Sequence, residues 1–145
     1  MTAMKMDFKW LGSKKQIAYE RSGGDEGALR LANNCKRLMT PYVPARDLVL
    51  SQKVRTYVKN GAGLIHYASP YAHYQYEGIM YLSSRNGSSW AREGEHKVPA
   101  RPRRELKQSK ASHALATSHW DKAMWTARGD DVIRSYQRWL NRRPR

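Results

Sequence analysis

The stretch PYVPARDLVLSQKVRTYVKNGAGLIHYASPYAHYQYEGIMY, residues 41–81, decides the fold, because it combines strand patterning, turn residues and a dense run of aromatic side chains. Residues 54–59 alternate Val, Thr and Val with Arg, Tyr and Lys, which is the period of a strand with one covered face. Residues 60–63 (NGAG) tolerate positive φ, so the chain reverses there and residues 64–67 return as the partner strand. The stretch therefore predicts a small antiparallel unit.

The tyrosine-rich end of this stretch is expected to leave the sheet. Pro70 has no N–H for a strand ladder, so residues 71–76 are predicted to form a short helical or irregular segment closed by Gly78. Tyrosines suit a protein interface, where the ring adds buried area and the hydroxyl stays satisfied. Beside basic residues they also suit stacking on the bases of single-stranded nucleic acid. A third interpretation is that some of them belong to the core.

Two elements are predicted before the central stretch. Residues 4–10 (MKMDFKW) alternate apolar with charged side chains, which predicts a strand with one apolar face and one wet face. In residues 25–40 the apolar side chains recur at spacings of three and four, so we expect an amphipathic helix with Asp25 as its N-cap. Pro41 and Pro44 end that helix.

The sequence changes character after the central stretch. Residues 83–118 are rich in Ser, Gly, Arg and Lys, and their few apolar residues follow neither period, which predicts a long basic loop or arm with Trp90 as its large apolar anchor. A short helix containing Trp120 is then expected to end at Gly129. A second helix is expected to begin with Asp130 as its N-cap.

Together these elements predict an α+β fold, in which a small antiparallel sheet packs against one long amphipathic helix and the C-terminal helices. A chain of 145 residues is long enough for one domain with a real core. We expect a single domain over residues 1–145, with its core in residues 4–82 and 119–141 and the extended basic arm in residues 83–118.

The charge balance indicates the kind of partner. The chain has 27 Lys and Arg against 12 Asp and Glu, a net charge of +15, which favours nucleic acid, an acidic protein surface or an anionic membrane. No apolar run approaches the ~20 residues needed to cross a bilayer, so no membrane partner is expected. The single cysteine, Cys35, excludes an intramolecular disulfide and is compatible with assembly in a reducing compartment.

No constellation of residues predicts catalysis. The five histidines show no i,i+4 pair and no thiolate or carboxylate at ligand spacing, so no metal site is expected. The acidic pairs at residues 25–26 and 130–131 each precede a predicted helix, where capping is the better interpretation. The glycines at 61 and 63 lack the Gly-Lys-Ser/Thr of a phosphate-binding loop. We therefore expect no enzyme, no cofactor and no metal.

Three phrases of the sequence, at residues 41–50, 65–78 and 119–125, resemble phrases of the minor capsid proteins of long-tailed bacteriophages, which are neck, tail-completion or head–tail joining components. In that family a helix runs into PYVP(F)RTGxL, and a strand pair leads to Y..PYA.YQYYG. The family chain ends in W..RM.AD.GDEV. The chain departs from the family at residues 47–48, where Asp-Leu replaces the usual Thr-Gly, and residues 83–118 contain no family phrase. The matching phrases are PYVPARDLVL (41–50), IHYASPYAHYQYEG (65–78) and HWDKAMW (119–125).

The resemblance implies a structural virion protein of the phage neck, assembled in the host cytoplasm. It implies a hexameric ring between the connector or stopper of the head and the terminator or tube of the tail, with genomic DNA passing through the lumen. The alternative is a basic nucleic-acid-binding module that uses residues 83–118 and the tyrosines. We expect residues 83–118 to reach out of their own domain and dock on a neighbouring subunit or an adjoining ring. The predicted interface residues are Tyr71, Tyr74, Tyr76, Trp90, Arg101, Arg103, Arg104 and Leu106.

Overall fold

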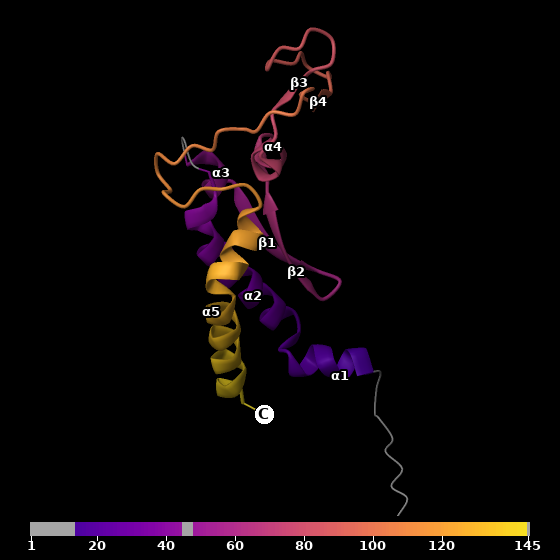
Figure 1. Ribbon diagram of the computed structural model, residues 1–145. Helices are drawn as coiled ribbons and strands as arrows, with labels where there is room; N and C mark the ends of the chain where they lie inside the picture. The colour runs from indigo at the N-terminus through magenta and orange to yellow at the C-terminus, as the bar shows by residue number, and fades with distance from the viewer. Residues whose placement is uncertain (1–13, 45–47, 145) are drawn as a thin grey trace, which may run out of the picture.

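The computed structural model describes residues 14–44 and 48–144 and has the predicted α+β architecture (Figure 1). The strand predicted at residues 4–10 lies outside the described residues. Within them, four strands form two separate two-stranded sheets, β1–β2 and β3–β4. The elements are α1 (Lys14–Arg21), α2 (Gly24–Met39), the 3₁₀ helix η1 (Thr40–Tyr42), α3 (Val49–Gln52), β1 (Val54–Lys59), β2 (Ala62–Tyr67), α4 (Ala72–Glu77), β3 (Tyr81–Ser83), β4 (Lys97–Pro99) and α5 (Trp120–Arg142).

The central hairpin is confirmed. β1 and β2 pair antiparallel from Val54 opposite Tyr67 to Lys59 opposite Ala62. Asn60 and Gly61 form the two-residue turn with φ of 53° and 74°, the left-handed values that such a hairpin turn requires. The return strand begins two residues earlier than expected. α2 packs against both strands, so the covered face of the hairpin is the one that faces this helix.

The long amphipathic helix is confirmed, but its predicted N-cap is wrong. Gly23 and Gly24 have φ of 95° and 60°, so the chain turns sharply and α2 begins at Gly24. Asp25 lies in the first turn, where its carboxylate accepts a hydrogen bond from the Tyr19 hydroxyl of α1. The helix ends at Met39, and Pro41 continues the chain as η1.

The two C-terminal helices predicted from the sequence are one helix, α5. Gly129 lies in its interior rather than at an end, and Asp130 is consequently not a cap. An interior glycine costs a helix about 1 kcal/mol relative to alanine. Here a buried stripe runs through the glycine, because Met124 and Val132 are at most 3 % exposed on either side of it. Burial of that stripe outweighs the weak preference of glycine for a helix end.

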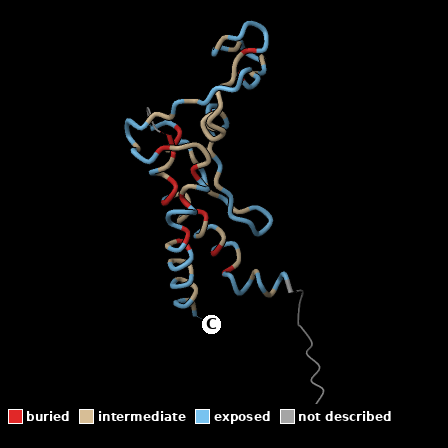
Figure 2. Tube along the Cα trace, in the orientation of Figure 1, coloured by how far each residue is buried: buried red, intermediate tan, exposed pale blue. Residues whose placement is uncertain are grey.

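The core lies where α2, η1, β2 and the first turns of α5 meet, as the buried residues in Figure 2 show. Val43 is fully buried there and follows η1 directly. Trp120, at the start of α5, is 3 % exposed and meets the rings of Tyr67 and Tyr76 edge-on at centroid distances of 5.3 and 5.1 Å. This aromatic cluster joins β2, α4 and α5.

The prediction that residues 83–118 form a loop throughout is wrong in its first part. Ser83 and residues 97–99 pair as the second sheet, in the register Tyr81 opposite Pro99 and Ser83 opposite Lys97. The β3–β4 ribbon, which we define as residues 81–99, lies beside α4 at the top of Figure 1, away from α2 and α5. Its three-residue strands are too short to show a period of two, and they pair across a loop that contains no strand signal.

The chain after the ribbon is hydrogen-bonded to its own domain. The Leu106 N–H donates to the Gly78 carbonyl at 2.8 Å, and the Gln108 side chain donates to the Gln75 carbonyl at 2.9 Å. Nearer to α5, the Thr117 N–H donates to the Tyr42 carbonyl at 3.0 Å. Residues 104–119 therefore cross α4 and η1 before α5 begins, so this part of the predicted arm lies on its own domain and does not reach out of it. Docking of residues 83–118 on a partner stays a prediction.

Candidate interaction site

The predicted tyrosines lie on or beside α4, but they face different surroundings. Tyr71 precedes the helix and is 63 % exposed. Tyr74 is half-buried against the ring of Tyr81 at 4.9 Å, and the Lys97 ammonium lies 5.5 Å from its ring centre. Tyr76 faces α5, where its hydroxyl donates to the Asp121 carboxylate at 3.0 Å. Among these three, only Tyr71 presents most of its ring to a partner.

Gly78 ends α4 in a left-handed conformation, as predicted. Its φ is 66°, and its N–H donates to the Tyr74 carbonyl. A Cβ at this position would lie 2.7 Å from the Ser118 Cβ, so the returning chain passes close against the glycine. Gly78 thus serves both the helix end and the passage of residues 104–119 across α4.

The other predicted interface residues do not gather at one place. Trp90 is 83 % exposed in the ribbon loop between β3 and β4. Arg101, Arg103 and Arg104 are exposed on the chain that follows the ribbon, and none of them forms an ion pair with another described residue. Leu106 is half-buried beside α4. The exposed Trp90 at the ribbon loop is therefore separate from the exposed arginines at residues 101–104, which we call the cationic segment.

A larger apolar surface was not predicted from the sequence. An open groove of about 770 Å³ lies between β2, α4 and the first turns of α5, and Cys35 and Met39 of α2 also line it. We call it the β2 groove. Leu64 on one side is 37 % exposed and Trp125 on the other is 52 % exposed. Exposed apolar patches and grooves of this kind mark sites of contact with a protein or another ligand.

The sequence predicts Trp125 on the same short helix as Trp120, and that prediction does not say that the two side chains lie on different sides of the helix. Five positions along a helix correspond to a rotation of about 140°. Both tryptophans line the groove, but Trp120 is buried in the core at 3 % exposed, whereas Trp125 is 52 % exposed. The signal was present in the spacing of the two tryptophans.

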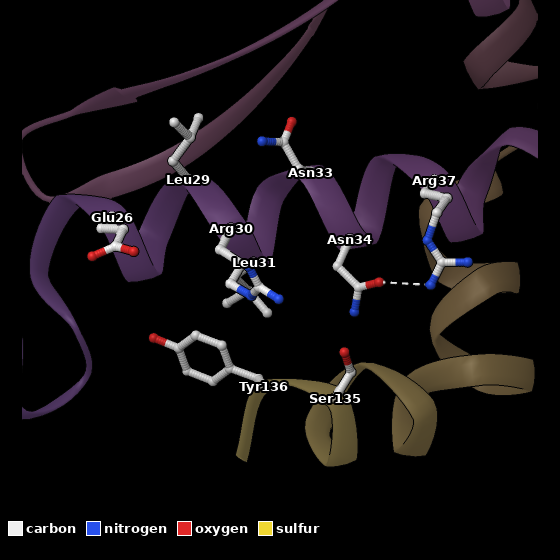
Figure 3. Close-up of a pocket in the computed structure, with 9 residues that line it drawn as sticks. All are labelled: Glu26, Leu29, Arg30, Leu31, Asn33, Asn34, Arg37, Ser135 and Tyr136. Atoms are coloured by element: carbon white, nitrogen blue, oxygen red, sulfur yellow. Dashed lines mark hydrogen bonds between the residues drawn. The ribbon is translucent and has the colours of Figure 1, made fainter. Parts of the chain in front are cut away.

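A second, polar pocket of about 400 Å³ lies between α2 and α5 (Figure 3). Glu26, Arg30 and Arg37 of α2 line one side, and Ser135 and Tyr136 of α5 line the other. The three charged side chains are exposed. The pocket therefore lacks the desolvated acid or base that general acid–base catalysis needs.

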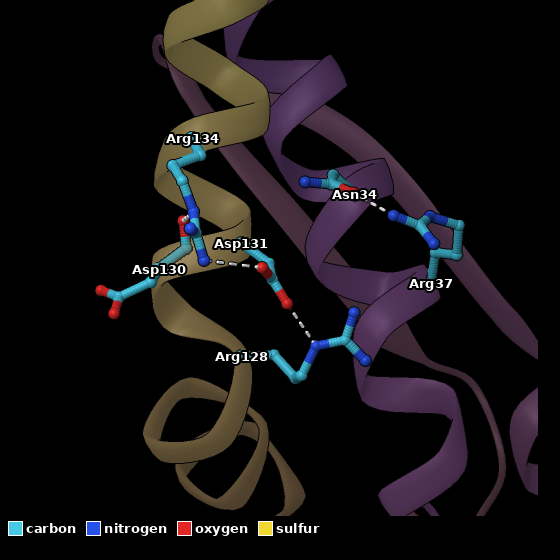
Figure 4. Close-up of polar contacts among 6 residues, drawn as sticks. All are labelled: Asn34, Arg37, Arg128, Asp130, Asp131 and Arg134. Atoms are coloured by element: carbon cyan, nitrogen blue, oxygen red, sulfur yellow. Dashed lines mark hydrogen bonds and ion pairs between the residues drawn. The ribbon is translucent and has the colours of Figure 1, made fainter.

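Of the acidic pair at the middle of α5, Asp131 is engaged in surface ion pairs rather than in capping, whereas the Asp130 carboxylate forms no ion pair with another described residue (Figure 4). Arg128 Nε lies 2.5 Å and Arg134 Nη2 lies 3.1 Å from the Asp131 carboxylate. The hydrogen bond from Arg128, with the added charge of Arg134, lowers the pKa of Asp131 below its ordinary value. Exposed pairs of this kind contribute little to stability, so their main effect is to hold the side chains of Arg128, Asp131 and Arg134 together on one face of α5.

Burial of Tyr67 predicts a pH dependence of stability. Desolvation raises the pKa of this tyrosine to about 12, above its ordinary value of 10.0. The neutral form is therefore favoured by folding, and this stabilisation is complete below the ordinary pKa and is lost as the pH rises through the folded value. We expect the urea midpoint to fall above about pH 10, and less steeply in Tyr67→Phe. Tyr71→Phe, at an exposed position, should retain the wild-type slope; equal slopes in all three proteins would contradict the assignment.

Comparisons with protein-family models, with curated proteins and with solved structures give no match. Among residues 14–44 and 48–144, no three His, Cys, Asp or Glu side chains are grouped to hold a metal ion. None of the helices in that part of the chain is long and apolar enough to cross a membrane. The features that remain for a function are the β2 groove, the exposed Trp90 and the cationic segment.

Proposed function

We propose that this protein is a structural component of the neck of a long-tailed bacteriophage, where it forms a ring that completes the joint between head and tail. The observation that carries the proposal is that the three family-like phrases meet in one core. Val43 comes from the first phrase, Tyr67 and Tyr76 from the second, and Trp120 from the third. Packing in the same core gives a structural reason for these three distant phrases to occur in one sequence.

Two local features support the resemblance. The family has Gly at the position of Leu48, and Leu48 here has a φ of 59°, in the left-handed region that favours glycine. The second phrase ends in Gly78, which the returning chain and a φ of 66° require. The left-handed φ of Leu48 is the conformation that a glycine at that position of the family phrase would favour.

A structural role also accounts for the surface. A net charge of +15 gives the strong positive field that acidic neighbours or the DNA in a lumen would attract. Arg101, Arg103 and Arg104 lack acidic partners among the described residues, so they are available to carboxylates or phosphates of another molecule. We propose that its neighbours are the connector or stopper of the head and the terminator or tube of the tail.

The test is made in a phage genome that carries this gene. A nonsense mutation in the gene should yield DNA-filled heads and free tails by electron microscopy, and wild-type protein from a plasmid should restore joined particles. The purified protein should have the mass of a closed oligomer, six copies by the resemblance. Normally joined particles from the nonsense mutant would remove the proposal.

The second candidate is a nucleic-acid-binding module, favoured by the unpaired cations after the ribbon. This function predicts a steep loss of affinity for short DNA with salt, because each neutralised phosphate contributes close to one unit of log–log slope. Replacing Arg101, Arg103 and Arg104 by serine should lower that slope by about 3. A slope unchanged by this replacement would exclude these arginines as phosphate contacts. Among the three predicted tyrosines, Tyr71, which precedes α4, has the most exposed ring for stacking.

A further inference from the structure

The β2 groove is bounded on one side by an unpaired strand edge. β2 pairs with β1 along one edge, and no described strand pairs with the other. Residues 63–65 and Tyr67 of β2 line the groove, whereas no residue of β1 does. An unpaired edge offers a row of N–H and C=O groups to an incoming strand, and such strand addition is a recurrent mode of peptide recognition.

The far side and floor of the groove are mainly apolar, although Asp121, Lys122 and Thr126 of α5 also line it. Trp125 and Met124 of α5 face β2 across it, and Met39 and Cys35 of α2 contribute to its lining. A strand that lay along β2 with one apolar face would satisfy the open edge with its backbone and fill the groove with alternate side chains. The opposite face of that strand would remain in water and is therefore expected to be charged.

The sequence contains one segment outside the described residues with this pattern. In a strand, residues 4–10 (MKMDFKW) would present Met4, Met6, Phe8 and Trp10 on one face and charged side chains on the other. Seven residues in strand conformation span about 23 Å, against about 20 Å for the six residues of β2. Their length and their alternation both match the groove.

The position of α1 favours a groove on another subunit. Tyr19, in the second half of α1, lies against Gly61 at the hairpin turn. Lys14 is at the other end of this helix, which points away from the rest of the fold (Figure 1). Only residues 11–13 connect Lys14 to the strand-like segment, a reach of roughly 10 Å. The Lys14 end of α1 is therefore placed to meet a neighbouring molecule.

We propose that the β2 groove binds residues 4–10 of a second copy of this chain as an added strand, and so forms the contact between subunits. Each copy then gives its segment to one neighbour and receives a segment from another. Such a head-to-tail contact closes into a ring when its rotation permits. The inference rests on the proposed function, because a ring needs the same subunit contact repeated around it. The contact itself is tested on purified protein alone.

Cys35 provides a native probe, because it is the only cysteine and it lines the groove. Phe8→Cys places a second thiol on the apolar face of the segment, and Asp7→Cys places one on the charged face. Burial raises the pKa of the Cys35 thiol, so the oxidation with copper phenanthroline is done at mildly alkaline pH. We expect a ladder of disulfide-linked multimers from Phe8→Cys on a non-reducing gel, and loss of that ladder with Asp7→Cys.

Three outcomes would overturn the proposal. A Phe8→Cys monomer that has consumed both thiols would place the segment on its own subunit. Equal ladders from the two variants would indicate random collision, and a ladder that persists when Phe8→Cys is combined with Cys35→Ser would indicate contact between two segments. Each of these results excludes the β2 groove of a neighbour as the site.

A second measurement does not depend on disulfide formation. Phe8→Asp should convert the oligomer to monomers in mass photometry while leaving the circular dichroism spectrum intact, and Lys9→Asp on the other face should leave the mass unchanged. An oligomer that survives Phe8→Asp would overturn the proposal. If virions that lack this protein are joined normally, the neck function is excluded, but a positive crosslink still supports the subunit contact. If the protein forms a ring without the crosslink, the subunit contact is excluded and the neck function is not.

Discussion

Replacing Trp120 with alanine is expected to lower the free energy of unfolding by about 3 to 5 kcal/mol, the usual cost of truncating a buried tryptophan. Its side chain is 3 % exposed and connects Tyr67 of β2 with Tyr76 of α4 through two edge-on ring contacts. Truncation would therefore remove the junction of three elements and not only one contact. Urea unfolding of dilute protein, followed by far-UV circular dichroism, measures the change.

Trp125→Ala is the matched control, because it removes the same side chain from the same helix. Trp125 is 52 % exposed, so its loss should cost less than about 1 kcal/mol in the free subunit. A similar cost for both substitutions would show that the core does not centre on Trp120. Assembly, unlike the stability of the free subunit, should be sensitive to Trp125 if the β2 groove is a subunit contact.

Gly63→Ala is expected to destabilise the subunit by about 2 to 3 kcal/mol, because there is no room for a side chain between β2 and α2. A Cβ at Gly63 would lie 2.3 Å from the Ala28 carbonyl oxygen and 3.1 Å from the Ala32 Cβ. A backbone oxygen cannot rotate away, so the whole helix would have to move off the strand. The same urea titration gives the magnitude.

Gly129→Ala is the control for this second substitution, and it is expected to have the opposite sign. The nearest atoms to a Cβ at Gly129 belong to the Trp125 ring at 3.3 Å, a half-exposed side chain that can shift. Alanine in a helix interior is favoured over glycine by about 1 kcal/mol, so the midpoint should rise. Equal losses for both glycines would contradict the close packing of α2 on β2.

The central hairpin was predictable because its signals are local. The alternation over residues 54–59 and the turn at Asn60 and Gly61 act within a few residues of one another, and both appear as expected. The interior position of Gly129 was not predictable from glycine alone, since its weak preference is opposed by buried residues on both sides. The β3–β4 pairing joins segments separated by a loop, and three-residue strands carry almost no periodic signal.

The candidate site was predictable only in part for the same reason. Exposure of Tyr71 and Trp90 agrees with the expectation that tyrosine and tryptophan are available to partners, whereas Tyr76 is turned inward by Asp121 and Trp120. The β2 groove depends on how α4, α5 and β2 are arranged in space. No short stretch of sequence contains that arrangement.

The β3–β4 ribbon has a kinetic consequence. Its loop is closed by Glu95, whose carboxylate accepts hydrogen bonds from the Ser83 hydroxyl and the Arg92 N–H. A two-stranded ribbon of this size is marginally stable by itself. We therefore expect the ribbon amides to exchange through local opening, and the amides of α2 and α5 to exchange through global unfolding. The amides of residues 81–99 therefore form a separate reporter: a partner that holds Trp90 will slow their exchange and leave the helices at their former rate.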